Sequence, residues 1–348
     1  MLFLKDYFSR FFPSNSGRGK YSSLKIALVS DALTQASLQA ECQIRNVTPD
    51  NYAAIFTNWR PDILFVESAW QGHRYAWRYQ LASYPDYPER NNEAMRRVLA
   101  CARDHGIPAV FWNKEDNVHY SRFIATAGLF ENIYTVDSNC IEKYRRDVPR
   151  AAVVDTLMFP VQPRFHYWQE RAIEKQNKSC FVGSYGTHVH PRRRHWQDML
   201  FKAFAPAGLD IYDRNSSRKA DHYRYPMLSG VRVYNKVAYR KTADLYRSYR
   251  FNLNVNTIEQ SPTMYSRRLI EILAVGGVAV SSPSLAASTL FTDYCEIVRN
   301  EDEINEIVHW SAARYKTAVE RARAGAKLIA ETHTWGRRLQ QLEQARLF

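Results

Sequence analysis

Arg267, Arg268 and Glu271 place two cations and a carboxylate on one turn of an otherwise apolar segment, SPTMYSRRLIEILAVGGVAVS, residues 261–281. Free amides at a helix N-terminus favour a phosphate, and arginine can add bidentate contacts. Glu271 follows the arginines by three and four residues on the same helix face, where it can accept hydrogen bonds from two vicinal hydroxyls such as those of a ribose. The alternative is an ordinary ion pair on a solvated face, which contributes about 0.3 kcal/mol.

The boundaries of this helix are suggested by its flanking residues. Ser261 followed by Pro262 predicts the start, because a serine hydroxyl caps free amides and proline is preset for the first helical position. Gly276 and Gly277 predict the end, and a short buried strand follows them.

Short β-branched apolar runs alternate with helix-like segments along the chain, which predicts an α/β fold with parallel, doubly wound sheets. In the first half these predicted strands lie in LKIALVSD, PDILFVES, GIPAVFWNKED and ENIYTVDS. In the second half they lie in SCFVGSY, GLDIYDR, RFNLNVN, GGVAVSS and YCEIVRN.

The length of 348 residues exceeds the size at which single cores usually stop growing, so two main domains are expected. The proline- and charge-rich stretch between Pro160 and Lys178 suits a linker. We therefore expect an N-terminal segment and linker over 1–23, a first domain over 24–165, a second over 166–325, and a C-terminal helix over 326–348 that crosses back to the first domain.

Ligands in open α/β sheets bind at the carboxyl ends of the strands. Polar residues gather directly after the predicted strands: Glu67 and Ser68, Asn113 to Asp116, Asp137 to Asn139, Gly183 to Tyr185, Asn254 and Asn256. Two such domains would form a central cleft lined by these residues.

The order of LNVN, a helix with Arg-x-x-Glu, a Gly-Gly pair and a buried strand resembles the donor-binding half of GT-B glycosyltransferases. More narrowly, the chain resembles the CgeB-like, spore-maturation-type family, with a glycosyltransferase group 1 C-terminal domain. The resemblance covers roughly residues 24 to 300. The segments that carry it are PDILFVESAWQG, IPAVFWNKEDNVHY, YTVDSNCIEKYR, FVGSY, GLDIYDR, YRKTADLYRSYRFNLNVN and SRRLIEILAVGGVAVS.

The resemblance implies a GT-B fold, two Rossmann-like domains facing a central cleft, with the acceptor in the first domain and a nucleotide-diphosphate sugar, most simply a UDP-sugar, in the second. The implied donor-binding residues are Gly183, Ser184, Asn254, Asn256, Tyr265, Ser266, Arg268 and Glu271. Glu271 would hold the ribose, while Arg268 and the amides near Tyr265 and Ser266 would face the diphosphate. Thr263 and Met264 replace the second glutamate of many retaining enzymes, which leaves the stereochemical outcome open.

An inverting transfer needs a base for the acceptor hydroxyl. Glu115, Asp116 and His119 form the densest titratable cluster after a predicted strand, and Glu67 is a second choice. Glu115 or Asp116 could instead cap a helix or pair with Lys114, and His119 could be a hydrogen-bonding loop residue. The family that the chain resembles generally uses helix dipoles and basic side chains, and the chain has no Asp-x-Asp sequence, so we expect no metal and no cofactor.

Several other side chains allow two interpretations. Arg192 to Arg194 could clamp a phosphate or form the solvated start of a helix. Trp70, Trp77 and Trp112 lie beside the predicted cleft, where they could stack on an acceptor sugar or pack in the core.

Forty-eight Lys and Arg against 35 Asp and Glu give a formal charge of +13, which favours anionic partners. The chain has no RNA- or DNA-binding motif, so we expect no nucleic-acid partner. The five cysteines are scattered and lack a Cys-x-x-Cys pair, which indicates buried thiols in a reducing cytoplasm. Residues 1–12, MLFLKDYFSRFF, have a helical apolar pattern that could bind the inner membrane surface or dock on the protein.

These features together predict a cytoplasmic, metal-independent, hexosyltransferase-like glycosyltransferase that acts on a glycan, lipid-linked or protein acceptor in cell-surface polysaccharide or glycoconjugate synthesis. One alternative is a nucleotide-sugar epimerase of the same fold. From a different class, a basic nucleic-acid-binding or scaffold protein is the other.

Overall fold

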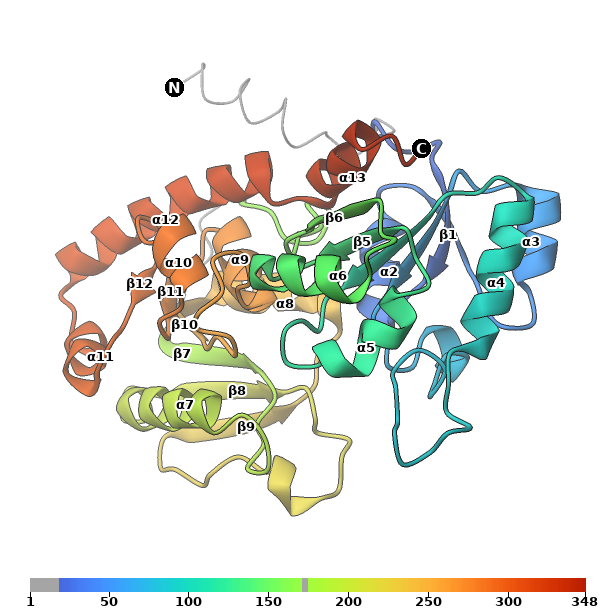
Figure 1. The fold of residues 1–348 in the computed structure, drawn as a ribbon. Helices are drawn as coiled ribbons and strands as arrows, with labels where there is room; N and C mark the ends of the chain where they lie inside the picture. The colour runs from blue at the N-terminus through green and yellow to red at the C-terminus, as the bar shows by residue number, and fades with distance from the viewer. Residues whose placement is uncertain (1–18, 171–174) are drawn as a thin grey trace, which may run out of the picture. The chain divides into compact units, whose positions relative to one another are not determined.

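The computed structural model describes residues 19–170 and 175–348, which form two compact α/β units (Figure 1). Unit 1 contains residues up to Gln162, residues 262–264 and residues 334–348, and unit 2 contains the rest. The first border thus falls at 162/163, close to the expected 165/166. The amphipathic segment 1–12 lies outside the described residues, so its predicted membrane contact stays a prediction.

Unit 1 is built on a six-stranded parallel sheet of order β2-β1-β3-β4-β5-β6. Its strands are β1 (Lys25–Val29), β2 (Gln43–Asn46), β3 (Ile63–Glu67), β4 (Ala109–Asn113), β5 (Asn132–Thr135) and β6 (Val153–Thr156). The central strands are continuous apolar runs because helices cover both of their faces.

Alternate residues of each strand enter opposite cores, as the two-residue period of a strand requires. In β1, Ala27 and Val29 face the core made with α3 to α6, whereas Ile26 and Leu28 face the core made with α2 and α13. The helices of unit 1 are α2 (Ala32–Leu38), α3 (Tyr52–Trp59), α4 (Glu93–Asp104), α5 (Tyr120–Ala127), α6 (Ile141–Asp147) and α13 (Trp335–Gln344), with the short η1 (His73–Tyr75) and η2 (Ser138–Cys140).

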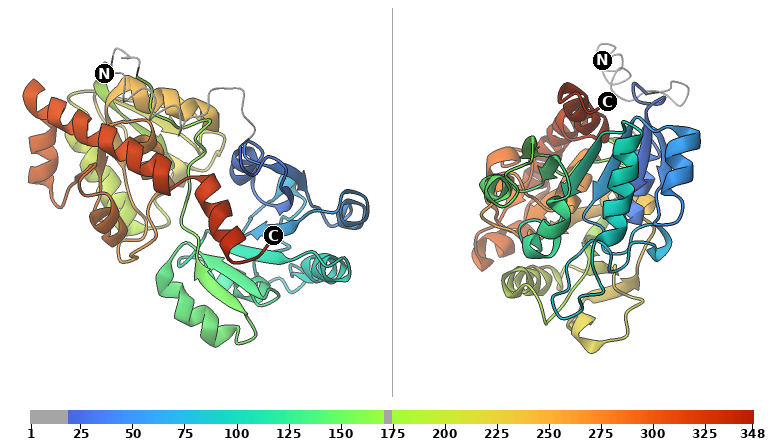
Figure 2. Two further views of the ribbon diagram at one scale, coloured as in Figure 1. Left: turned by 90° about the horizontal axis from the view of Figure 1, so that it is seen from above. Right: turned by 45° about the vertical axis from the view of Figure 1, so that its right-hand side comes forward.

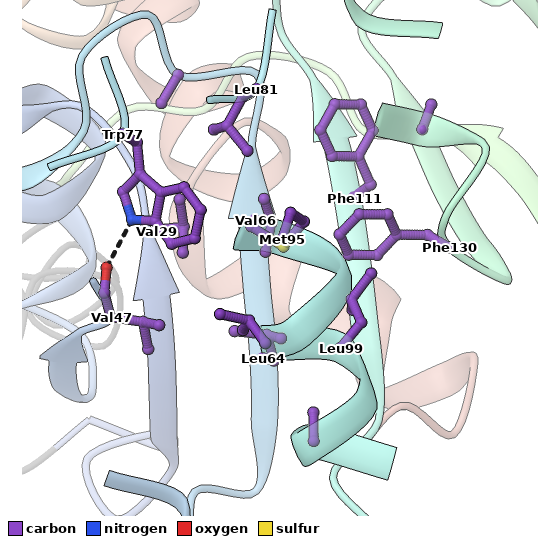
Figure 3. Packing of buried hydrophobic residues seen from close by; sticks show 14 of the residues in the cluster. Val29, Val47, Leu64, Val66, Trp77, Leu81, Met95, Leu99, Phe111 and Phe130 are labelled. Atoms are coloured by element: carbon purple, nitrogen blue, oxygen red, sulfur yellow. Dashed lines mark hydrogen bonds between the residues drawn. The ribbon is translucent and has the colours of Figure 1, made fainter. Parts of the chain in front are cut away.

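Tryptophan side chains are central to both cores of unit 1. Trp77 is 0% exposed and donates from Nε1 to the Val47 carbonyl at 2.7 Å, in the same core cluster as Leu64, Val66 and Met95 (Figure 3). Trp112 is 1% exposed, and its ring lies 5.7 Å from that of Trp335. Of the two interpretations given for these tryptophans, core packing is therefore confirmed for Trp77 and Trp112, and stacking on an acceptor sugar is not.

Unit 2 contains a second six-stranded parallel sheet, of order β12-β11-β10-β7-β8-β9. Its strands are β7 (Gln176–Gly183), β8 (Leu209–Asp213), β9 (Val231–Asn235), β10 (Tyr249–Asn254), β11 (Ala279–Ser281) and β12 (Glu296–Ile297). If β7 to β12 are renumbered 1 to 6 in chain order, the strand order read from β9 to β12 is 3-2-1-4-5-6. This is the strand order of doubly wound nucleotide-binding sheets.

The helices of unit 2 are α7 (Pro191–Phe204), α8 (Thr242–Ser248), α9 (Arg267–Ala274), α10 (Leu285–Leu290), α11 (Glu301–Val308) and α12 (Ala312–Thr332), with η3 (Asp221–Tyr223) and η4 (Tyr239–Lys241). Apolar residues of α7, α11 and α12 form one core with the sheet, and α9 packs on α12 and on β10 and β11. Figure 2 shows the break between α12 and the short final helix α13. Because the break falls at the unit border, only α13 belongs to unit 1.

All five cysteines are free thiols, and four of them are buried. Of the helices in the described residues, not one combines the length and the apolar composition that a membrane crossing needs.

Candidate functional site

The switch point of the unit 2 sheet lies between β7 and β10, the neighbours whose connections run to opposite sides. Ligands of open α/β sheets bind at the carboxyl ends of the strands at this point. Gly183 ends β7 and is followed by Ser184, whereas Asn254 ends β10. The fold thus brings together residues that the sequence analysis took from two separate strands.

Gly183 is a position at which a side chain of α9, that of Arg268, comes close to the end of β7. A Cβ atom there would lie 2.5 Å from the Phe181 ring and 3.0 Å from Arg268 Nη2. Arg268 donates from Nε to the Val182 carbonyl at 2.6 Å, and its guanidinium lies 4.3 Å from the centre of the Phe181 ring. A glycine therefore leaves the space in which Arg268 lies against the end of β7.

Arg268 is a buried cation, only 8% exposed. Burial, with smaller contributions from the guanidinium groups of Arg193 and Arg214, lowers its pKa to about 10, so it stays protonated at pH 7. Its Nη1 is buried and has no hydrogen-bond partner among the described residues. Such a group costs free energy unless a ligand satisfies it, and an anion does so best.

Glu271 lies one turn further along α9 and is 5% exposed. Arg267 Nε is 3.3 Å from Glu271 Oε1, but the contact is an ion pair without hydrogen-bond geometry, and this oxygen accepts no hydrogen bond from the described residues. The predicted alternative, an ion pair between these two residues, does form. The pair is buried, however, and not on a solvated face.

His166 adds a neutral group to the surroundings of Glu271. Burial lowers its pKa to about 4, against the opposing effect of the Glu271 charge. The imidazole Nε2 is 2.8 Å from Thr242 Oγ1, and the buried Nδ1 has no partner among the described residues. His166 was not predicted, because an isolated histidine in a linker-like stretch carries no local signal.

The predicted helix start at Ser261 and Pro262 is wrong, because α9 begins at Arg267 with Ser266 as N-cap. The intervening Thr263 accepts a hydrogen bond from Ser138 N at 2.9 Å and donates to the Val136 carbonyl at 2.9 Å, all within unit 1. These contacts hold the backbone outside a helix and override the local capping signal.

Tyr265 and Ser266 differ in what they can offer a ligand. The Tyr265 side chain is buried against Phe291, and its hydroxyl lies 2.9 Å from His333 Nδ1. Ser266 N donates to Asn256 Oδ1 at 3.0 Å. The Tyr265 side chain thus points into the interior, and the Ser266 amide, which was expected to face the diphosphate, is already hydrogen-bonded.

Asn254 and Asn256 are fully buried and hold the ends of β10 and β11 together. Asn254 Nδ2 donates to Ser281 Oγ at 2.9 Å, and Asn256 Nδ2 donates to the Ser282 carbonyl at 2.8 Å. With the bond from Ser266 N, this network fixes the start of α9 relative to the sheet. These two predicted binding residues therefore hold the start of α9 in place through the ends of β10 and β11.

A pocket of about 220 Å³ adjoins the switch point and is lined by Ser184, Tyr185, His188, Arg193, Arg218 and Tyr223, among others. Arg193 donates from Nη2 to the Ser184 carbonyl at 3.1 Å, and its buried Nε has no partner among the described residues. Arg192 is instead paired with Glu259 at 2.5 Å, and Arg194 bonds the Thr187 carbonyl. Of this arginine triplet, Arg193 is the one placed for an anion.

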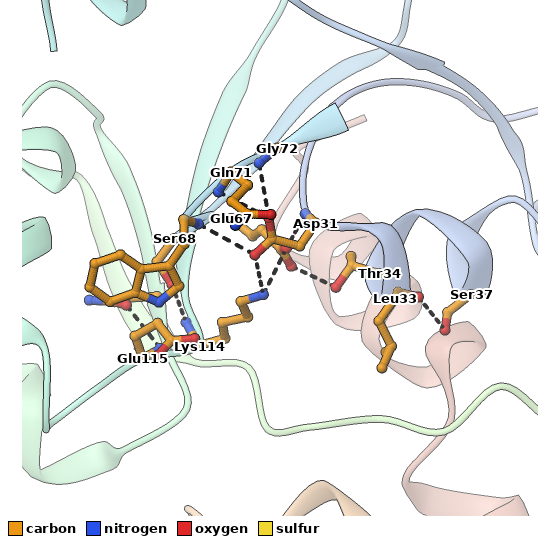
Figure 4. Close-up of polar contacts among 12 residues, drawn as sticks. Asp31, Leu33, Thr34, Ser37, Glu67, Ser68, Gln71, Gly72, Lys114 and Glu115 are labelled. Atoms are coloured by element: carbon orange, nitrogen blue, oxygen red, sulfur yellow. Dashed lines mark hydrogen bonds and ion pairs between the residues drawn. The ribbon is translucent and has the colours of Figure 1, made fainter. Parts of the chain in front are cut away.

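The predicted catalytic residues lie in unit 1. Glu67 is fully buried at the end of β3 and accepts hydrogen bonds from Asp31 N at 2.6 Å, Thr34 Oγ1 at 2.6 Å and Lys114 Nζ at 2.9 Å (Figure 4). Lys114 also lies 3.2 Å from Asp31 Oδ2. A base must reach the acceptor hydroxyl, so the enclosed Glu67 does not fit that role and anchors the switch point of this sheet instead.

Asp116 is also fully buried. It accepts hydrogen bonds from Asn113 Nδ2 at 2.8 Å, Thr135 Oγ1 at 2.7 Å and Tyr144 OH at 2.9 Å. Burial raises the pKa of Asp116 to about 7 against the opposing effect of the Thr135 and Tyr144 hydrogen bonds. The carboxyl group is therefore partly protonated near neutral pH, but it is closed off from a substrate.

Glu115 and His119 are the two predicted catalytic side chains that stay partly exposed. The ion pairs of Lys114 go to Glu67 and Asp31 and not to Glu115 or Asp116, although the Glu115 charge contributes to raising the pKa of Lys114. The His119 ring packs edge-on against Trp70 at 5.0 Å, and burial lowers its pKa, so the imidazole is neutral at pH 7.

Comparisons with known proteins agree with this architecture. A family model described as glycosyl transferase-like matches residues 191–344, a range that includes Arg268 and Glu271. A search of curated protein sequences finds no match.

Solved structures with similar folds include an α-glucosyltransferase in complex with UDP and a 13-mer DNA containing an HMU base, with a TM-score of 0.59, 13% identity and coverage of 94% of this chain and 99% of that one. Anabaena Alr3699/HepE in complex with UDP-glucose has a TM-score of 0.55 and 12% identity, and the match covers 90% of this chain and 88% of that one. Sucrose-phosphate synthase from Thermosynechococcus elongatus has a TM-score of 0.53 and 12% identity, and the match covers 86% of this chain and 76% of that one. The chain thus has the GT-B glycosyltransferase fold, and its second half carries a glycosyltransferase-like domain.

Proposed function

We propose that this protein is a glycosyltransferase that binds a nucleotide-diphosphate sugar, most simply a UDP-sugar, in unit 2 and transfers its sugar to a glycan, lipid-linked or protein acceptor bound by unit 1. The proposal includes the narrower CgeB-like assignment and a role in cell-surface polysaccharide or glycoconjugate synthesis. Its support is the GT-B fold, the glycosyltransferase-like domain and the chemistry of the switch point in unit 2.

One observation carries the proposal: a buried guanidinium and a buried carboxylate lie one helical turn apart, each with an atom that makes no hydrogen bond to a described residue. Arg268 Nη1 is a donor without an acceptor, and Glu271 Oε1 is an acceptor without a hydrogen-bond donor. A nucleoside diphosphate supplies both missing partners, since its phosphates accept hydrogen bonds and its ribose hydroxyls donate them.

In the reaction, cleavage of the glycosidic bond of the donor leaves negative charge on the diphosphate. Arg268, supported by Arg193 from the adjacent pocket, would stabilise that charge as it develops. Because these cations are held by Val182, Ser184 and the end of β7, they need no reorganisation during the reaction. Glu271 would hold the ribose and so fix the position of the diphosphate along α9.

The proposed base for the acceptor hydroxyl is Glu115 or His119 in unit 1, the two partly exposed members of the predicted cluster. A neutral imidazole accepts a proton, so the lowered pKa of His119 keeps it in the form that a base requires.

Thermal shift with UDP-, GDP-, CMP- and dTDP-sugars tests the proposal on wild type and on Glu271→Gln, which keeps the shape of the side chain and removes its charge. Glu320→Gln, at an exposed site on α12, is the matched control. We expect one nucleotide class to stabilise wild type and the control, and to stabilise Glu271→Gln much less. Stabilisation by none of them would refute the proposed function, and an equal shift in Glu271→Gln would refute the role of this residue.

The epimerase alternative needs no acceptor, so product analysis after incubation with the donor alone separates the two enzymes. A changed sugar still attached to its nucleotide would support an epimerase. Release of nucleoside diphosphate that depends on an added acceptor would support a transferase. We further place the enzyme in the cytoplasm, at the inner face of the membrane, on the basis of its free cysteines and the pattern of residues 1–12.

A further inference from the structure

Unit 1 contains a second pocket, of about 450 Å³, at the carboxyl end of β2. Small-molecule sites commonly span about 300–1,000 Å³, so this pocket has the size for one sugar unit. Its polar lining includes Arg45, Thr48, Asn51, His73 and Arg74, with Ile55 as an apolar wall.

Two arginines give this pocket an uncompensated positive charge. Arg45 and Arg74 are both exposed, and neither makes an ion pair or hydrogen bond with a described residue. The Arg45 guanidinium lies 5.0 Å from the centre of the Trp59 ring, which holds its plane against an aromatic face. Among the residues that the structure describes, no carboxylate lines the pocket. A bound anion would therefore meet two guanidinium groups that do not have to break an existing pair.

The turn that carries His73 and Arg74 is held at both ends. At its start, Asp31 Oδ1 accepts hydrogen bonds from Gly72 N at 2.9 Å and Gln71 N at 3.3 Å (Figure 4). At its end, the buried Trp77 is bonded to Val47 (Figure 3). The pocket wall is thus fixed before any ligand arrives.

The backbone of this turn is strained, because Arg74 has a φ of 51°. Gly72, with a φ of +67°, has no room for a side chain, since a Cβ atom would lie 2.6 Å from the Trp77 ring. A left-handed arginine persists only where its surroundings hold it, and such positions are concentrated at binding sites. Here the conformation makes Arg74 part of the pocket wall.

We propose that this pocket binds the anionic group of the acceptor, a phosphate or a carboxylate carried on a sugar ring, so that the enzyme prefers an acidic or phosphorylated glycan over a neutral one. The inference rests on the proposed function. The arginines would bind the charged group, and Ile55 would contact the apolar face of the ring.

Binding of glucuronate, glucose 6-phosphate and glucose to the full chain, measured by calorimetry at constant ionic strength, tests this. The variants are Arg45→Gln and Arg74→Asn, because asparagine tolerates a left-handed backbone. Arg97→Gln, an exposed arginine on α4 without a partner among the described residues, is the matched control. We expect wild type and the control to bind an anionic sugar at least about tenfold more tightly than glucose, and each pocket variant to lose about tenfold.

Equal binding of glucose, or unchanged binding in both pocket variants, would overturn the inference. If inorganic phosphate binds as tightly as glucose 6-phosphate, the sugar ring contributes nothing to binding, and the pocket is a nonspecific anion site and not an acceptor site. A short single-stranded DNA that binds more tightly than either sugar would make the partner a nucleic acid. All variants are also tested for UDP-sugar stabilisation: if it persists while the sugar result fails, the acceptor inference is wrong and the proposed function stands.

Discussion

Asp116→Asn should remove a large pH dependence from the stability of unit 1. The wild-type carboxyl group is fully buried, and burial raises its pKa from 3.8 to about 7. Between these two values the folded chain holds a proton that the unfolded chain has lost. This contribution to stability is therefore complete below about pH 4 and disappears as the pH rises through 7.

The size of the effect follows from the shift. A difference of about 7 − 3.8, or about 3 pKa units, corresponds to about 4 kcal/mol over the whole range. Acidification from pH 8 to pH 5 covers most of this interval, so we expect the free energy of unfolding of wild type to rise by about 3 kcal/mol relative to Asp116→Asn. The asparagine also places an amide nitrogen beside the three groups that donate hydrogen bonds to Asp116. The resulting loss of stability is independent of pH, so it does not change the slope of stability against pH.

Because the chain forms two compact units, the assay must report on unit 1 alone. Hydrogen exchange of the β4 amides in native conditions does so, and the pH dependence of intrinsic exchange cancels between wild type and variant. Asp86→Asn, at an exposed site of the same unit, is the control and should leave the slope unchanged. If the free energy of unfolding of wild type minus that of Asp116→Asn stays constant or falls between pH 8 and pH 5, the reasoning is refuted.

Three further predictions follow from close contacts and burial. Gly183→Ala should cost about 1–3 kcal/mol in urea unfolding and weaken UDP-sugar stabilisation, because its Cβ would lie 2.5 Å from Phe181; an unchanged thermal shift would contradict this. Lys114→Met should cost about 3–5 kcal/mol by leaving Glu67 buried and unpaired, and adding Glu67→Gln should recover much of it in the same assay. Trp335→Ala should lower the free energy of unfolding of unit 1, measured by hydrogen exchange of its amides, by about 3–5 kcal/mol, because this ring joins the core from α13. A loss of protection confined to α13 would contradict this and show that unit 1 is stable without the helix.

The sequence predicted the central strands well because they are buried on both faces and read as unbroken apolar runs. It missed β2, β6 and β9, which lie at the edges of the two sheets. Most residues of β9 are exposed, and β2 alternates between exposed and half-buried positions. Such strands are held by backbone pairing with a neighbour, which leaves little trace in the side-chain pattern.

The candidate site shows the same division between local and long-range information. The contact between Arg267 and Glu271 follows from helix geometry, since residues four apart lie on one face, and it was the stated alternative to a ribose contact. The start of the helix was predicted wrongly, because Thr263 is held by Val136 and Ser138, far away in sequence. Local capping rules do not contain such contacts.

The burial of the Glu67 and Asp116 carboxylates was the least predictable feature. Glu67 ends its strand, a position that marks the ligand-binding edge of a sheet, and this pattern made it a candidate base. Its burial arises because β3 lies between β1 and β4, so that Asp31 follows one neighbour and Lys114 follows the other. The order of strands decides which charges meet, and that order depends on crossovers that no single segment specifies. The same order places the pocket of Arg45 beside the turn that Asp31 holds, which is why the proposed anion site follows from the structure and not from the sequence.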